Sequence, residues 1–99
     1  MGKVKELIID TEDREKRNYI MPEIGPEDLA RAIHFHRKKT NLSQAELAKL
    51  AGVGKTVVFD VEKGKTTVRL DTLQKILAVL NIKMIFRSPL MHSFLGRSK

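Results

Sequence analysis

The spacing of small, glycine and β-branched residues between positions 44 and 61 constrains the fold more than any other feature. Ala48 is followed four positions later by Gly52, and Val58 and Val61 come six and nine positions after that glycine. Two helices that meet at a sharp angle need a small residue at the crossing, a positive φ in the turn and branched apolar residues facing inward. The spacing is typical of a DNA-binding helix-turn-helix, although a helical hairpin in an ordinary bundle is the alternative.

Helix signals on both sides of this segment predict a mainly α-helical domain. Ser43 and Glu46 form the S-x-x-E pattern of a capping box, which starts a helix that Gly52 ends. Gly64 ends the next helix, because glycine tolerates the left-handed cap conformation. In all, four helices are expected, over about 27–39, 43–51, 55–63 and 70–80.

Residues 82–87 change to a two-residue period and predict a short strand. A strand without a partner exposes unpaired backbone groups and invites association. We expect it to pair with its copy across a two-fold axis, which creates a dimer. The alternative is that it pairs with the apolar residues 3–9 of the same chain. The two pairings are compatible in one larger sheet. The dimer contacts are expected from Ile82, Met84, Ile85 and Phe86.

Charge is distributed unevenly along the 99 residues, whose net charge is +7. Residues 1–25 hold five basic and six acidic side chains, a net of −1, so the 14 basic and six acidic side chains of residues 26–99 give +8. This excess indicates an anionic partner, with nucleic acid first. Four parts are expected: an N-terminal arm (1–25), the helix-turn-helix domain (26–81), a dimerisation strand (82–87) and a tail (88–99) that is disordered or docks on a partner.

Residues 29–80 resemble the Cro/C1-type (XRE) helix-turn-helix family. The resemblance is carried by NLSQAELA at 41–48, Gly52-Val53, VEKG at 61–64 and LDTLQKIL at 70–77. Within that family, the helix followed directly by a strand over 70–86 resembles the HipB-type antitoxins. The resemblance implies a lambda-repressor-like domain of four to five helices, with a C-terminal strand paired across a dimer. It also implies a palindromic operator in double-stranded DNA, repression of the protein's own operon and binding of a HipA-type kinase toxin.

The third helix of such a domain enters the major groove with its N-terminal end foremost. Ser43 and Gln44 are expected to hold a phosphate at the start of the second helix. Phe59 and Asp60 depart from the family's usual residues. Phe59 could contact a thymine methyl group or a protein, and Asp60 repels phosphate but could accept from cytosine N4. The expected DNA contacts are Lys38, Lys39, Ser43, Gln44, Gly54, Lys55, Thr56, Phe59, Asp60 and Lys65, with Lys49, Lys63 and Arg69 as further phosphate contacts.

Arg37 and Glu62 occupy positions that resemble a family ion pair between the first and third helices. Such a pair fixes orientation more than it adds stability. The alternative is that both side chains are independently solvated.

Catalytic and metal sites are not expected. Gly54-Lys55-Thr56 resembles the end of a P-loop, but Lys49 stands where that motif needs its first glycine. His34 and His36 are two positions apart on a helix and cannot chelate a metal from one face. The chain has no cysteine, which excludes disulfides and thiolate zinc sites.

The chain is expected to stay outside the membrane, because no apolar run approaches the roughly 20 residues of a span. No secretory signal is recognised at the start, so the expected location is the cytoplasm, at the nucleoid. The sequence therefore predicts a non-enzymatic, cofactor-free DNA-binding repressor with a HipA-like partner. Two alternatives remain: an XRE-family regulator without a toxin partner, and a protein-interaction module that uses the same face.

Overall fold

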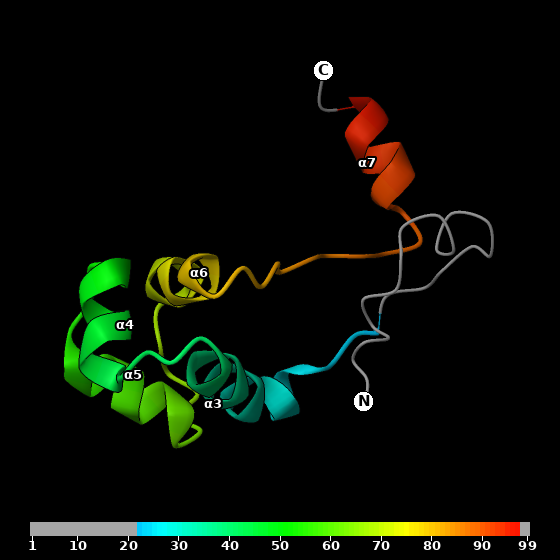
Figure 1. Ribbon diagram of the computed structural model, residues 1–99. Helices are drawn as coiled ribbons and strands as arrows, with labels where there is room; N and C mark the ends of the chain where they lie inside the picture. The colour runs from blue at the N-terminus through cyan, green and yellow to red at the C-terminus, as the bar shows by residue number, and fades with distance from the viewer. Residues whose placement is uncertain (1–21, 98–99) are drawn as a thin grey trace, which may run out of the picture.

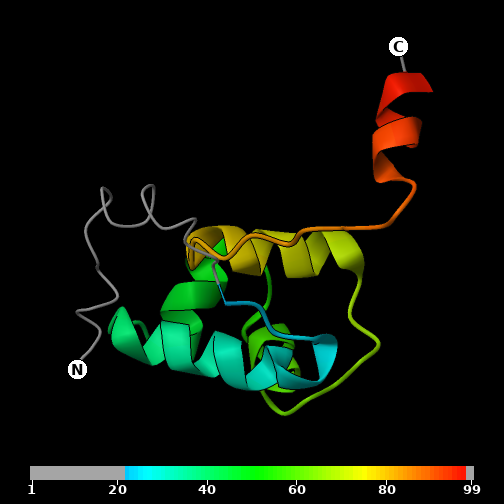
Figure 2. The same ribbon diagram turned by 90° about the vertical axis from the view of Figure 1, so that its right-hand side faces the viewer.

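The computed structural model describes residues 22–97, and its helices form a bundle from which the C-terminal part projects (Figures 1 and 2). The four helices expected between positions 27 and 80 are all present, and their ends lie within one or two residues of the predicted ones. In chain order the elements are the 3-10 turn η1 (Pro26–Asp28), α3 (Leu29–Lys39), α4 (Gln44–Ala51), α5 (Lys55–Glu62), α6 (Leu70–Val79) and α7 (Met91–Arg97).

Local interactions explain where α4 begins and ends. The hydroxyl of Ser43 accepts from the backbone N–H of Glu46 at 3.0 Å, and Glu46 Oε1 accepts from the backbone N–H of Ser43 at 2.7 Å. This capping box satisfies two of the free N–H groups at the start of the helix. At the other end, Gly52 has a φ of 74°, a conformation that strains residues with a Cβ atom. The chain turns there and starts α5 three residues later.

The core includes the three apolar residues whose spacing predicted the fold. Ala48, Val58 and Val61 are buried, as are residues from α3 and α6. α4 packs against both α5 and α6, and α3 packs against α5. As a result, one face of α5 is fixed against the bundle while its opposite face remains in solvent. The largest fully buried side chains are Ile33, Leu47, Val58 and Ile76.

The predicted strand at 82–87 is not formed in the single chain. Within residues 22–97 no strand is present, and residues 82–88 run away from α6 without regular secondary structure (Figure 1). A strand needs a backbone partner, and the part of the chain that the structure describes supplies none for this segment. Ile82 and Met84 pack against the core, whereas Ile85 and Phe86 are exposed. The alternative pairing with residues 3–9 lies outside the described residues, as does most of the predicted N-terminal arm.

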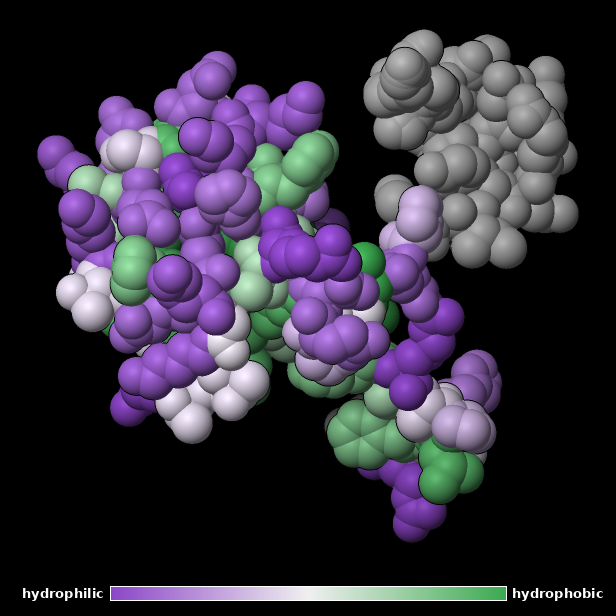
Figure 3. Space-filling model, turned by 90° about the horizontal axis from the view of Figure 1, so that it is seen from below, coloured by the Kyte–Doolittle hydropathy of each residue, from purple (hydrophilic) through white to green (hydrophobic). Residues whose placement is uncertain are grey.

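The tail contains a short helix, α7, which stands apart from the bundle (Figure 2). Apolar residues gather on this projecting part, while the bundle seen from below presents a mainly hydrophilic surface (Figure 3). None of the helices described between residues 22 and 97 has the length and apolar character that crossing a membrane requires.

Candidate nucleic-acid interface

The solvent face of α5 carries four of the ten residues predicted to contact DNA, and a fifth, Gly54, lies directly before the helix. Gly54 is the N-cap of this helix, and its backbone is extended there. Lys55 and Thr56 in the first turn are exposed, and the Phe59 side chain one turn further on is 46% exposed. Since Val58 and Val61 hold the other face of α5 in the core, these outward positions follow from the helical spacing.

A surface hollow of about 670 Å³ lies where the end of α3 meets the starts of α4 and α5. It is lined by residues of three consecutive elements, and it combines the charges of Lys38 and Lys55 with the N-terminal end of α4. Such an end attracts anions, because its backbone N–H groups point outward. Four predicted contacts line the hollow, namely Lys38, Ser43, Gln44 and Lys55.

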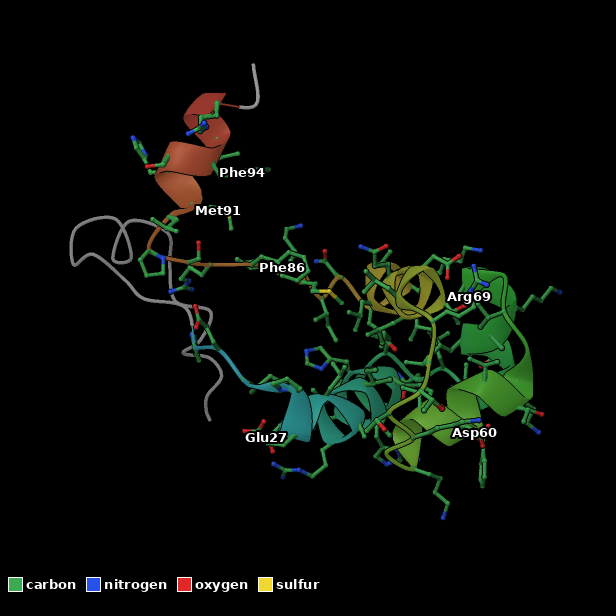
Figure 4. The ribbon with its side chains drawn as sticks, turned by 180° about the vertical axis from the view of Figure 1, so that it is seen from behind. Glu27, Asp60, Arg69, Phe86, Met91 and Phe94 are labelled. Atoms are coloured by element: carbon green, nitrogen blue, oxygen red, sulfur yellow. The ribbon has the colours of Figure 1, made fainter. Side chains whose placement is uncertain are left out.

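The remaining predicted contacts lie outside this hollow. Lys39 Nζ lies 5.6 Å from the ring centroid of Phe35 on α3. Asp60 lies in the last turn of α5, and Lys65 lies in the loop after this helix. Asp60 Oδ2 and Lys65 Nζ are 3.7 Å apart. Figure 4 shows Asp60 at the edge of the bundle. The lysine offsets the repulsion that the Asp60 carboxylate exerts on a phosphate.

Arg37 and Glu62 meet between α3 and α5, behind the candidate interface. Arg37 Nε donates to Glu62 Oε2 at 2.6 Å, and Arg37 Nη2 donates to Oε1 at 3.0 Å. The two side chains are only 9% and 5% exposed. Arg37 Nη1 also donates to the backbone carbonyl of Leu42 at 2.9 Å, in the turn before α4. This bidentate pair therefore ties three elements of the motif together.

Two further residues complete the polar cluster around Glu62. His34 Nδ1 lies 2.9 Å from Oε1 of Glu62 and 3.3 Å from Nη2 of Arg37. It donates to Glu62 in the tautomer that carries the hydrogen on Nδ1, because a carboxylate only accepts. Gln44 Nε2 donates to the same oxygen at 3.2 Å, which joins the first residue of α4 to the last of α5. Sequence reasoning placed Gln44 on DNA and missed its role here. It also missed His34, although its spacing of three from Arg37 places both on one face of α3.

The cluster shifts the ionisation of both charged partners. Burial by itself raises the pKa of Glu62, but the hydrogen bonds from Arg37, His34 and Gln44 outweigh burial and hold this pKa below its ordinary value. The hydrogen bond to Glu62 raises the pKa of Arg37 despite its partial burial. Both groups are therefore charged in the folded protein at neutral pH.

The lowered pKa of Glu62 predicts a loss of stability in acid. The folded state keeps Glu62 ionised at pH values where the unfolded chain already binds a proton, so its stabilisation is present above the unfolded pKa of about 4.3 and is lost as pH falls through the lower folded pKa. Urea titrations at several pH values should show a shallower acid decline for Glu62→Gln than for the native chain. Asp71→Asn is the control, because Arg69 lowers the pKa of Asp71 on the open surface, where water screens the pair. An equal flattening in both variants would contradict the prediction.

Metal coordination has no candidate in the part of the chain that is described. Between residues 22 and 97, no three or more histidine, aspartate or glutamate side chains are grouped so that they could hold a metal ion.

Comparisons with known proteins agree with this geometry. The HTH_3 family model, described as helix-turn-helix, matches residues 33–86, more than half of the chain. The "Uncharacterized HTH-type transcriptional regulator y4mF" of Sinorhizobium fredii (strain NBRC 101917 / NGR234) is 34% identical over 64 residues, which cover 65% of this chain and 84% of the relative.

Solved structures with a similar fold include protein–DNA complexes. A chain of the HipA-HipB-O2-O3 complex is 27% identical with a TM-score of 0.60, covering 71% of this chain and 99% of that chain. A HipB-O4 20mer complex gives 27% identity and a TM-score of 0.59 at the same coverage. SinR, a master regulator for biofilm formation in complex with DNA, is 32% identical with a TM-score of 0.52, covering 56% of this chain and 89% of that chain.

The family match includes both helices of the motif, the Arg37–Glu62 pair and most of the core. The chain therefore belongs to the HTH_3 family of XRE-type helix-turn-helix transcriptional regulators.

Proposed function

We propose that this regulator is a sequence-specific repressor that inserts α5 into the major groove of an operator and holds the flanking backbone with the start of α4. The observation that carries the proposal is the orientation of α5. Its buried residues fix one face in the core, and the opposite face presents Lys55, Thr56 and Phe59 beside the positively charged hollow. A major groove about 12 Å wide admits a helix in this way. The likeness to HipB and SinR chains solved with DNA supports it.

The proposed operator is palindromic, because the proposed active form is a dimer joined through residues 82–87. Ile85 and Phe86 are 69% and 67% exposed, which leaves apolar side chains in water beside an unpaired backbone. Figure 4 shows Phe86 on the segment between α6 and α7, outside the bundle. Pairing with a second copy covers both. Two α5 helices then read half-sites about 34–36 Å apart.

We further propose that the protein is the antitoxin of a HipA-type kinase, represses its own operon and works in the cytoplasm on the chromosome. Support comes from the similarity to the HipB chain of a HipA-HipB-O2-O3 complex over 71% of the present chain. Co-purification from the native host tests this: a kinase encoded beside the regulator should be retained. Recovery of the regulator on its operator with no such kinase would favour a stand-alone regulator.

Lys55→Ala tests the DNA interface itself. If Lys55 bonds a base, the variant should lose about 1–3 kcal/mol of discrimination at one base pair, and if it holds a phosphate, all sequences should weaken alike with a smaller salt dependence. Fluorescence anisotropy with specific and scrambled duplexes over a salt series measures both. Lys75→Ala on α6 removes the same charge outside the hollow and should change neither quantity. Unaltered binding by Lys55→Ala would remove Lys55 from the interface.

A further inference from the structure

We propose that Phe59 is a specificity-determining residue that contacts the C5-methyl group of a thymine in the operator. The inference rests on the proposed function and adds the chemical feature that α5 recognises. Its basis is the position of an exposed aromatic ring among cations, at the point where α5 faces the start of α4.

The position of Phe59 is set by the helix. Its neighbours Val58 and Val61 are buried, so the ring points to the solvent side of α5. Residues four apart lie one above the other on a helix, which places Lys55 one turn before Phe59 and Lys63 one turn after it. Lys63 Nζ lies 5.4 Å from the ring centroid, over the ring. The outer ridge of α5 is therefore an apolar group between two cations.

Phe59 lies on the same side of α5 as the predicted phosphate site. It lines a second hollow, of about 530 Å³, together with His34, Gln44, Glu62 and other polar residues. Gln44 also lines the first hollow, beside Lys55. The two hollows thus share the first residue of α4, and Phe59 lies beside the surface that is proposed to receive DNA.

The surroundings of the ring favour DNA over a protein. The centres of protein interfaces are depleted of charged residues, whereas the residues that share the hollow with Phe59 are all polar or charged: Arg31, His34, Gln44, Glu62 and Lys63. A phosphate backbone pairs with cations such as Arg31 and Lys63, and the groove between its strands presents one apolar group, the C5-methyl of thymine. Contact with that methyl group removes apolar area of both partners from water.

The test replaces thymines of the selected operator singly with deoxyuridine, which removes only the methyl group. For the native full-length chain, one position in each half-site should weaken binding about four-fold, the equivalent of one buried methyl group. Phe59→Ala should bind both duplexes equally, and Phe59→Leu should retain part of the difference. Phe35→Ala is the matched control, because Phe35 is an exposed ring with Lys39 Nζ at 5.6 Å, but it lies on α3.

The outcomes separate the inference from the proposed function. Specific binding that is sensitive to deoxyuridine in the native chain and insensitive in Phe59→Ala supports both. Specific binding in which every deoxyuridine duplex affects the native chain and Phe59→Ala alike overturns the methyl contact and leaves the repressor intact; loss of a protein partner in the same variant would then assign the ring to protein binding. Failure of the native chain to prefer any duplex overturns both.

Discussion

Replacing Arg37 with methionine is expected to lower the free energy of unfolding by about 3–5 kcal/mol. The variant keeps much of the side-chain volume but leaves the Glu62 carboxylate, 5% exposed, without the guanidinium that neutralises it. His34 and Gln44 still reach the carboxylate, but neither replaces the bidentate contact. The free energy of unfolding of a small domain is about 5–15 kcal/mol, so the expected loss is a large part of the total. Urea denaturation followed by circular dichroism measures it.

The double variant Arg37→Met/Glu62→Leu distinguishes two effects: the loss of the ion pair, and the cost of leaving one buried charge without a partner. Because it removes both charges, it should recover most of the stability that the single variant loses. The surface pair Arg69–Asp71, whose Nε and Oδ1 are 3.0 Å apart, is the control. Its double-mutant cycle should give no more than about 1 kcal/mol, since water screens both charges. Additive effects in the Arg37–Glu62 cycle would contradict a role for the pair in orienting α3 and α5.

Charges placed at Ile85 and Phe86 are expected to convert the proposed dimer to a monomer and to weaken operator binding about 100-fold or more. A linked second half-site contributes an effective concentration that a monomer lacks. The double variant Ile85→Asp/Phe86→Asp tests the dimer contact more specifically than truncation after Asn81 does, because truncation also removes the core contacts of Ile82 and Met84. Sedimentation equilibrium and anisotropy measure the two effects.

Leu50→Asp is the control for this prediction. Leu50 is an exposed apolar residue at the end of α4, so the variant places a negative charge on an exposed apolar position outside the 82–87 segment. It should leave the oligomeric state unchanged. A dimer that survived the paired substitution would place the dimer contact elsewhere, and α7 would be the next element to vary.

The helices could be predicted because the signals that define them are local. The Ser43–Glu46 capping box and the left-handed Gly52 act within one turn of the residues that carry them. The burial of Ala48 and Val58 follows from the helical period of the same segment. These features are sufficient to set which face of α5 lies in the core, and so which face is free to bind.

Features that depend on partners distant in the sequence could not be predicted in the same way. The alternation at 82–87 shows where a strand could form, but pairing requires a second backbone that the described chain does not supply. The position of His34 against Glu62 joins residues 28 positions apart, and no periodicity reports such a contact. The direction of the Phe59 ring was predictable, whereas the cations around it and its place beside Gln44 depend on the packing of α5 against α4.

Footprinting of the DNA upstream of the regulator's own gene, with the native full-length protein and excess unrelated DNA, measures whether α5 reads a specific operator. We expect protection of two half-sites related by a two-fold axis, with centres about 10–10.5 base pairs apart, and loss of this protection with Lys55→Ala or rising salt. Uniform protection that the competitor DNA removes, or no protection at any concentration, would show that α5 reads no specific operator there.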